Sequence, residues 1–121
     1  MKFDIRDRTK IFAIRIIKLV KKLPKDVAGF GLGNQLLRSG TSIGANLEEA
    51  DAASSRNDFF YKVSISYKEA KETRYWLELI LESDMLQNDL NLKEAESLKN
   101  EALELSKILF SIIGKKSNVT K

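Results

Sequence analysis

The chain has 121 residues, a net charge of +4, no cysteine and no histidine. The two missing residue types exclude disulfide bonds, thiolate chemistry, the commonest catalytic base and the commonest metal ligands. Hydrophobic residues make up 43% and charged residues 31% of the chain, which excludes wholesale disorder and is typical of one soluble domain, residues 1–121.

Charge is distributed unevenly along the chain. Residues 1–28 carry +6, residues 29–92 carry −4 and residues 93–121 carry +2. No stretch reaches the roughly 18 apolar residues of a membrane span, and the N-terminal segment lacks the apolar core of a signal peptide. We therefore expect a cytoplasmic protein without a membrane partner.

The first predicted helix covers residues 7–23. Its apolar residues recur at alternating intervals of four and three, the spacing of a bundle helix. This seam consists of Phe12, Ile16, Leu19 and Leu23. Ile14 and Ile17 lie outside the seam, so the apolar face is wider than one packing partner requires. Pro24, the only proline, lacks an amide donor and predicts the end of the helix.

Basic residues occupy the side opposite the seam. They are Arg15, Lys18, Lys22 and Lys25. A row of this kind either binds the phosphates of RNA or DNA or is only a solvated helix face. Both interpretations remain open from the sequence.

The second predicted helix covers residues 32–53, after a connection at Lys25–Gly31. Its core face is at helical spacing and includes polar residues. The face contains Leu32, Leu36, Ser39, Ile43, Asn46, Leu47, Ala50 and Ala53. Gly40 and Gly44 are four residues apart, which favours close approach by another helix. We expect the Asn46 amide to bond to a neighbouring helix, to Glu49 or to Ser42, and to specify register rather than to bind a ligand.

The third predicted helix covers residues 57–83, and Ser55 with Asp58 resembles an N-capping pair. Its core stripe is Phe59, Val63, Ser66, Ala70, Thr73, Leu77 and Ile80. Tyr75 and Trp76 fall largely off this stripe. Together with Ile14 and Ile17 they are candidates for a subunit interface.

The fourth predicted helix covers residues 92–113. Asn91 and Glu94 have capping-box spacing, and Gly114 is a reasonable stop. Its seam is Leu98, Ala102, Leu105, Leu109 and Ile112. We expect residues 117–121 to be frayed. Four amphipathic helices with short connections predict an all-α, up-down-up-down antiparallel four-helix bundle.

Catalytic patterns are weak. Two glutamate pairs, Glu48 with Glu49 and Glu69 with Glu72, resemble ligands of a di-metal bundle site, but such sites also use histidine, which the chain lacks. Solvated or ion-paired glutamates are the simpler interpretation. Ser39 and Ser42 have no histidine base. We therefore expect no enzyme activity, no metal and no cofactor.

The second and third helices carry a combination of residues that resembles one known family. The matching positions are Arg38, Ser39, Ser42, Ile43, Asn46, Glu49 and Glu72. They resemble the four-helix-bundle family of intervening-sequence proteins, named for genes inserted within bacterial 23S ribosomal RNA genes. Two departures are Ala50, where glycine is common, and Glu69, where a small residue is usual.

The resemblance implies a homopentameric ring of bundles. It also implies kinship with accessory proteins of diversity-generating retroelements, which bind nucleic acid and a reverse transcriptase. The family name describes gene location, so a ribosomal role does not follow from it. From the residues and the resemblance together we expect a non-enzymatic oligomeric bundle with a binding or scaffolding role. RNA or DNA is the leading partner, and a protein–protein assembly module without nucleic-acid binding is the alternative.

Overall fold

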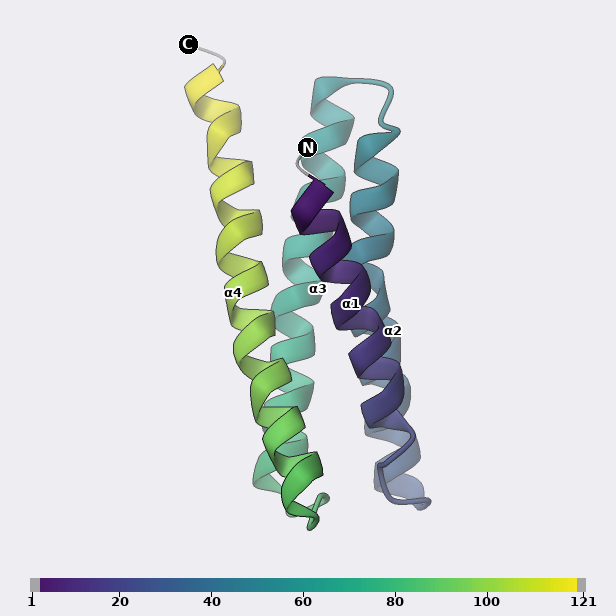
Figure 1. Ribbon diagram of the computed structural model, residues 1–121. Helices are drawn as coiled ribbons and strands as arrows, with labels where there is room; N and C mark the ends of the chain where they lie inside the picture. Colours follow the sequence, from purple (N-terminus) through teal and green to yellow (C-terminus); the bar gives the residue numbers. More distant parts are fainter. Residues whose placement is uncertain (1–2, 120–121) are drawn as a thin grey trace.

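Four helices make up the computed structural model, which describes residues 3–119. The helices are α1 (Phe3–Val20), α2 (Val27–Asp51), α3 (Arg56–Glu82) and α4 (Asp89–Val119). Each helix contacts the helices before and after it, α4 closes the circle on α1 with the fewest contacts, and diagonal pairs do not touch. Figure 1 shows the antiparallel arrangement, with the α1–α2 and α3–α4 connections at the same end. The predicted all-α, up-down-up-down bundle is confirmed.

The core follows the predicted seams. All four residues of the first predicted seam are buried, although Leu23 lies beyond the end of α1. The first four seam residues of α4 are buried too, as is every member of the α3 stripe except Phe59, which is half-buried. On α2, Leu36, Ile43, Leu47 and Ala50 are buried. Helical periodicity therefore located the interior of the bundle correctly.

Glycines on α2 bring it close to α1. A Cβ atom built on Gly40 would lie 2.9 Å from Cγ2 of Ile16, and one on Gly44 would lie 3.2 Å from Oγ1 of Thr9. These separations are tighter than ordinary van der Waals contact. The predicted role of both glycines in close helix packing is confirmed, and their neighbour is α1.

The first connection is shorter than predicted, and α1 ends at Val20 rather than at residue 23. Two tight backbone bonds follow, from the Lys22 amide to the Leu19 carbonyl (2.8 Å) and from the Leu23 amide to the Val20 carbonyl (3.2 Å). Helix α2 begins at Val27 rather than at residue 32, because the Asp26 carboxylate accepts a hydrogen bond from the Gly29 amide at 2.8 Å. An aspartate N-cap outweighs the low helix propensity of the glycines that follow it.

The other helix ends also differ from the predicted bounds. Helix α1 begins at Phe3 instead of residue 7, α2 ends at Asp51 instead of residue 53, and α3 is shifted by one residue at each end. The predicted cap of α3 is confirmed, since Ser55 Oγ accepts a hydrogen bond from the Asp58 amide at 3.0 Å.

Helix α4 is longer than the predicted 92–113. Asn88, not Asn91, caps it: Asn88 Oδ1 accepts hydrogen bonds from the Leu90 amide (2.8 Å) and the Asn91 amide (3.2 Å). The helix continues through Gly114 to Val119, so this glycine is not a stop. Of the predicted frayed tail, residues 117–119 are helical, and residues 120–121 lie outside the described residues.

None of the four helices, within residues 3–119, has the length and apolar character that crossing a bilayer requires.

Candidate nucleic-acid interface

The arginines of α1 are held by carboxylates on neighbouring helices. The pairs are Arg6–Glu48, Arg8–Glu101 and Arg15–Glu94. Arg15 contacts Glu94 through Nε (3.0 Å) and Nη2 (2.9 Å), and Nη2 also donates to Ser97 Oγ at 2.8 Å. The hydrogen bond to Glu94 raises the pKa of Arg15. Arg15 is therefore ion-paired within the bundle, unlike the three lysines predicted to share its face.

Lysines crowd the end of the α1–α2 hairpin instead. Lys18 is on α1, and Lys22 and Lys25 follow the end of that helix. Lys21 lies between them and belongs to the same group. All four side chains are exposed, and none makes an ion pair within residues 3–119. We call these four residues the lysine surface.

Lys21 was missed by the sequence analysis. Its intervals of three residues from Lys18 and four from Lys25 match a helical row, so the signal was present in the sequence.

The N-terminus of α2 follows the lysine surface directly, and its N-cap residue, Asp26, is acidic and exposed. The partial positive charge of the helix N-terminus is therefore offset by the Asp26 carboxylate, which accepts a hydrogen bond from the Gly29 amide at 2.8 Å. Gly29 allows the preceding connection to pack against the first turn of α2, since a Cβ there would lie 1.8 Å from the Pro24 carbonyl oxygen. The backbone on which the lysines sit is therefore held in place against α2.

The same end of the bundle also carries negative charge. Exposed acidic residues lie in or beside the α3–α4 connection (Figure 1). They are Glu82, Asp84 and Asp89. This end therefore carries charge of both signs: the α1–α2 side has four exposed lysines and Asp26, and α4 adds the exposed Lys93.

The family-motif arginine joins α2 to α3. Arg38 donates from Nη2 to Glu72 at 2.7 Å and from Nη1 to Glu69 at 3.2 Å. The hydrogen bond to Glu72 raises the pKa of Arg38. Burial raises the pKa of Glu69 more than the nearby guanidinium lowers it. This cluster fixes the α2–α3 pair and leaves none of its three charged groups without a partner.

The remaining motif side chains are also occupied internally. Thr73 Oγ1 donates to Ser39 Oγ at 2.8 Å, and Ser42 Oγ donates to the Arg38 carbonyl at 2.6 Å. Asn46 Nδ2 donates to the carbonyl of Ser42 at 2.8 Å, one of the partners expected for it. Glu49 accepts a hydrogen bond from Lys62 Nζ at 2.7 Å. The motif residues therefore appear in the fold as scaffold contacts.

The four candidate interface residues do not behave alike. Ile14 and Ile17 are 43% and 39% exposed, and Tyr75 is 53% exposed. Trp76 is half-buried and packs against the core. Its indole N–H is buried and has no acceptor within the described part of the chain. Ile14, Ile17 and Tyr75 thus remain available to a partner surface, whereas Trp76 is mainly part of the bundle.

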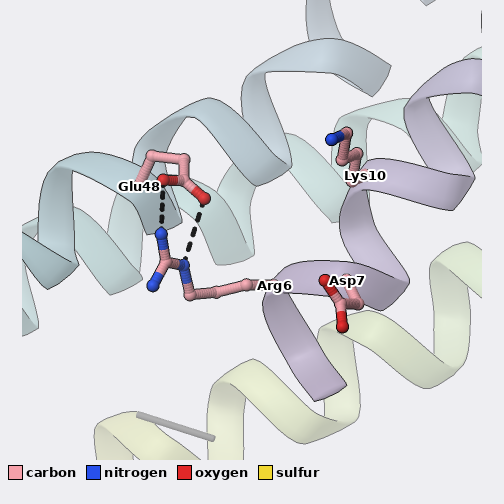
Figure 2. A pocket seen from close by; sticks show the side chains of 4 residues that line it. All are labelled: Arg6, Asp7, Lys10 and Glu48. Atoms are coloured by element: carbon pink, nitrogen blue, oxygen red, sulfur yellow. Dashed lines mark hydrogen bonds and ion pairs between the residues drawn. The ribbon is translucent and has the colours of Figure 1, made fainter. Parts of the chain in front are cut away.

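A hollow at the other end of α1 is small and lined by charged side chains. Arg6, Asp7, Lys10 and Glu48 line a space of about 280 Å³. Figure 2 shows the Arg6 guanidinium turned toward Glu48 and bonded to it. Ligand pockets are usually larger and mainly apolar. Across residues 3–119 no cluster of acidic side chains is arranged to hold a metal ion.

Comparison with known proteins places the fold in a family. A family model described as 23S rRNA-intervening sequence protein matches residues 1–111. The fold resembles the crystal structure of a protein of unknown function from the S23 ribosomal protein family of Bacteroides thetaiotaomicron. The TM-score is 0.80 and the identity 44%, over 90% of this chain and 97% of that chain. No curated protein matches the chain. The resemblance noted in the sequence is confirmed, and the chain belongs to the 23S rRNA-intervening sequence protein family.

Proposed function

We propose that this protein is a non-enzymatic binding protein that holds the phosphate backbone of RNA or DNA on its lysine surface. The supporting observation is that the arginines of α1 are ion-paired, whereas the lysines near its end are not, in the described part of the chain. The arginines of α1 are neutralised by carboxylates on α2 and α4, whereas Lys18, Lys21, Lys22 and Lys25 are exposed and have no acidic partner among residues 3–119. Four of the five basic residues between residues 5 and 28 that make no ion pair with the described residues therefore lie at one end of the bundle, and the fifth is Lys10.

Lysine side chains favour contacts with phosphate rather than with base edges. The ammonium group is a compact charge on a flexible stem, and it contacts phosphates without reading sequence. Binding should therefore show little base preference and weaken steeply with salt. In the homopentameric ring that we propose from the family resemblance, the lysine surface would be repeated in every subunit and gain avidity.

The non-enzymatic part of the proposal rests on how the candidate catalytic groups are used. Glu48 and Glu49 are paired with Arg6 and Lys62, and Glu69 and Glu72 share Arg38. A carboxylate committed to an ion pair is a poor general base. The hydroxyls of Ser39 and Ser42 have hydrogen-bond partners within the bundle.

The proposal is tested by reversing charge on the lysine surface. Both Lys18 and Lys22 are exposed, so Lys18→Glu combined with Lys22→Glu should leave helicity unchanged and abolish binding. Fluorescence anisotropy with labelled RNA and DNA, over a range of salt concentrations, measures the effect. For wild type we expect a log–log salt slope of about −0.9 per phosphate neutralised on duplex DNA.

A matched control separates local from global charge. Lys68→Glu with Lys115→Glu makes the same change in net charge, and both residues are exposed on α3 and α4 away from the lysine surface. This variant should retain most of the wild-type affinity. The proposal is overturned if wild type fails to bind at low salt, or if the two double variants lose affinity equally.

A protein–protein assembly module is the second candidate. Its support is the apolar surface on α1 and α2, where Ile14, Ile17 and Leu37 are all exposed. Exposed isoleucines on neighbouring turns of one helix are typical of association surfaces rather than of solvated faces. If wild type binds no nucleic acid, this function takes the place of the first.

A further inference from the structure

An exposed aromatic residue follows the lysine surface in the chain. Phe30 is in the first turn of α2 and its side chain is 57% exposed. Val27, three residues earlier on the same face of the helix, is 91% exposed. Both residues lie within the connection predicted at Lys25–Gly31, for which no role was expected.

The backbone holds Phe30 close to the lysine-bearing connection. The Phe30 amide donates to the carbonyl of Asp26 at 2.9 Å. The next residue toward the N-terminus, Gly29, contacts the Pro24 carbonyl so closely that no side chain fits between them. Lys25 directly precedes the N-cap of the helix that presents Phe30. Lys22 is two residues before Pro24.

The faces of the Phe30 ring are not used by other aromatic groups. Within residues 3–119 Phe30 has no ring partner and no cation over its ring. Phe110 on α4 has a similar exposure of 62%, but its ring lies 5.6 Å from that of Tyr67. Phe30 is thus an aromatic side chain presented to solvent, five residues after Lys25 and four after the Asp26 N-cap.

An exposed ring flanked by lysines suits one class of nucleic acid. Unpaired bases have free π-faces that stack on aromatic side chains, while the neighbouring phosphates are neutralised by basic residues. In a duplex those base faces are already stacked on one another and are not accessible to a ring. A lysine cluster alone would not distinguish the two forms.

We propose that the α1–α2 end binds single-stranded nucleic acid, with one unpaired base stacked on Phe30 and the flanking phosphates held by the lysine surface. This inference rests on the proposed function and narrows it from any phosphate backbone to single strands. Because stacking tolerates every base, binding remains nearly independent of sequence.

The test compares a single-stranded RNA 12-mer with a duplex RNA of the same length, both fluorescently labelled. Phe30→Leu keeps an apolar side chain but removes the π-face, and it should weaken single-strand binding by about fivefold or more while duplex binding changes by less than about twofold. Phe30→Trp restores a stacking surface and should retain single-strand affinity. Phe110→Leu, the same change at an equally exposed ring on α4, should have no effect. Circular dichroism verifies that each variant is folded.

The outcomes distinguish stacking on Phe30 from phosphate binding by the lysine surface. Lys18→Glu with Lys22→Glu should lose both single-strand and duplex binding. Suppose that the lysine variant loses binding. If Phe30→Leu then binds like wild type, or if Phe30→Leu loses affinity for single strand and duplex equally, stacking on Phe30 is overturned and the lysine function stands. If the lysine variant binds like wild type, both proposals are overturned.

Discussion

At the scale of single residues, the closest contact between α1 and α2 lies where α2 has no side chain. A Cβ on Gly40 would lie 2.9 Å from a buried Ile16 that has no room to move. Gly40→Ala should therefore lower the free energy of unfolding by about 1–3 kcal/mol through overpacking, although alanine raises helix propensity by about 1 kcal/mol. Chemical denaturation monitored by circular dichroism measures the change.

Gly31 provides the matched control in the same helix. A Cβ there meets nothing within 4 Å, so Gly31→Ala gains helix propensity without a clash and should stabilise the protein by up to about 1 kcal/mol. Stabilisation by both alanines would show that α1 and α2 can move apart at Gly40 at no cost.

At the scale of helix pairs, two ion-paired glutamates respond to pH in opposite directions. The hydrogen bond from Arg6 lowers the pKa of Glu48 below its ordinary value of 4.5, so the ionised carboxylate stabilises the α1–α2 pair above that pH and the contribution is lost as pH falls. Burial raises the pKa of Glu69 above 4.5, so its ionisation costs stability as pH rises. Relative to wild type, Glu48→Gln should therefore lose stability and Glu69→Gln should gain it between about pH 4 and about pH 7.

Denaturant titrations of the two glutamine variants at several pH values measure these differences. As the pH falls below about 4, both variants should approach wild type: Glu69 is then protonated in both states, and Glu48 becomes protonated in the folded protein only as the pH passes its lowered pKa. A stability loss for Glu69→Gln that grows with pH would show that its ion pair with Arg38 outweighs the cost of burial.

Helical periodicity predicted the interior of each element better than its ends. The seams of α1 and α4 needed only the spacing of apolar residues, which depends on one helix at a time. The start of α2 was missed because Gly29 and Gly31 resemble a loop, while the aspartate cap before them decides the boundary. The end of α4 was missed because one exposed glycine costs a long helix only about 1 kcal/mol.

The candidate site was partly predictable, because residue spacing reveals which side chains share one face of a helix. Spacing placed Lys18, Lys22 and Lys25 on one side of the chain, and they are exposed as expected. Spacing also placed Arg15 there, but its partner Glu94 is 79 residues away on α4. A pattern along one helix contains no information about a charge that only the tertiary fold brings near.

At the scale of the whole molecule, the bundle leaves apolar side chains exposed that its own packing does not use. Ile14 and Ile17 on α1 remain exposed, and α2 presents Leu37. The glycines of α2 let the two helices lie close together, so these side chains lie on a pair of helices rather than on isolated ones. Burial of such a surface between copies is the simplest way to remove it from water.

Oligomerisation is therefore expected, with five chains as the number that the family resemblance implies. Light scattering should give a mass well above the 13.7 kDa of one chain. Ile14→Glu with Ile17→Glu should reduce that mass to a monomer without loss of helicity, because both side chains are already exposed in the single bundle and contribute little to its core. Tyr75→Glu, at an exposed ring on α3, tests the other candidate surface in the same assay. A wild-type monomer at micromolar concentration would contradict the prediction, and dissociation by Tyr75→Glu alone would move the interface from α1 to α3.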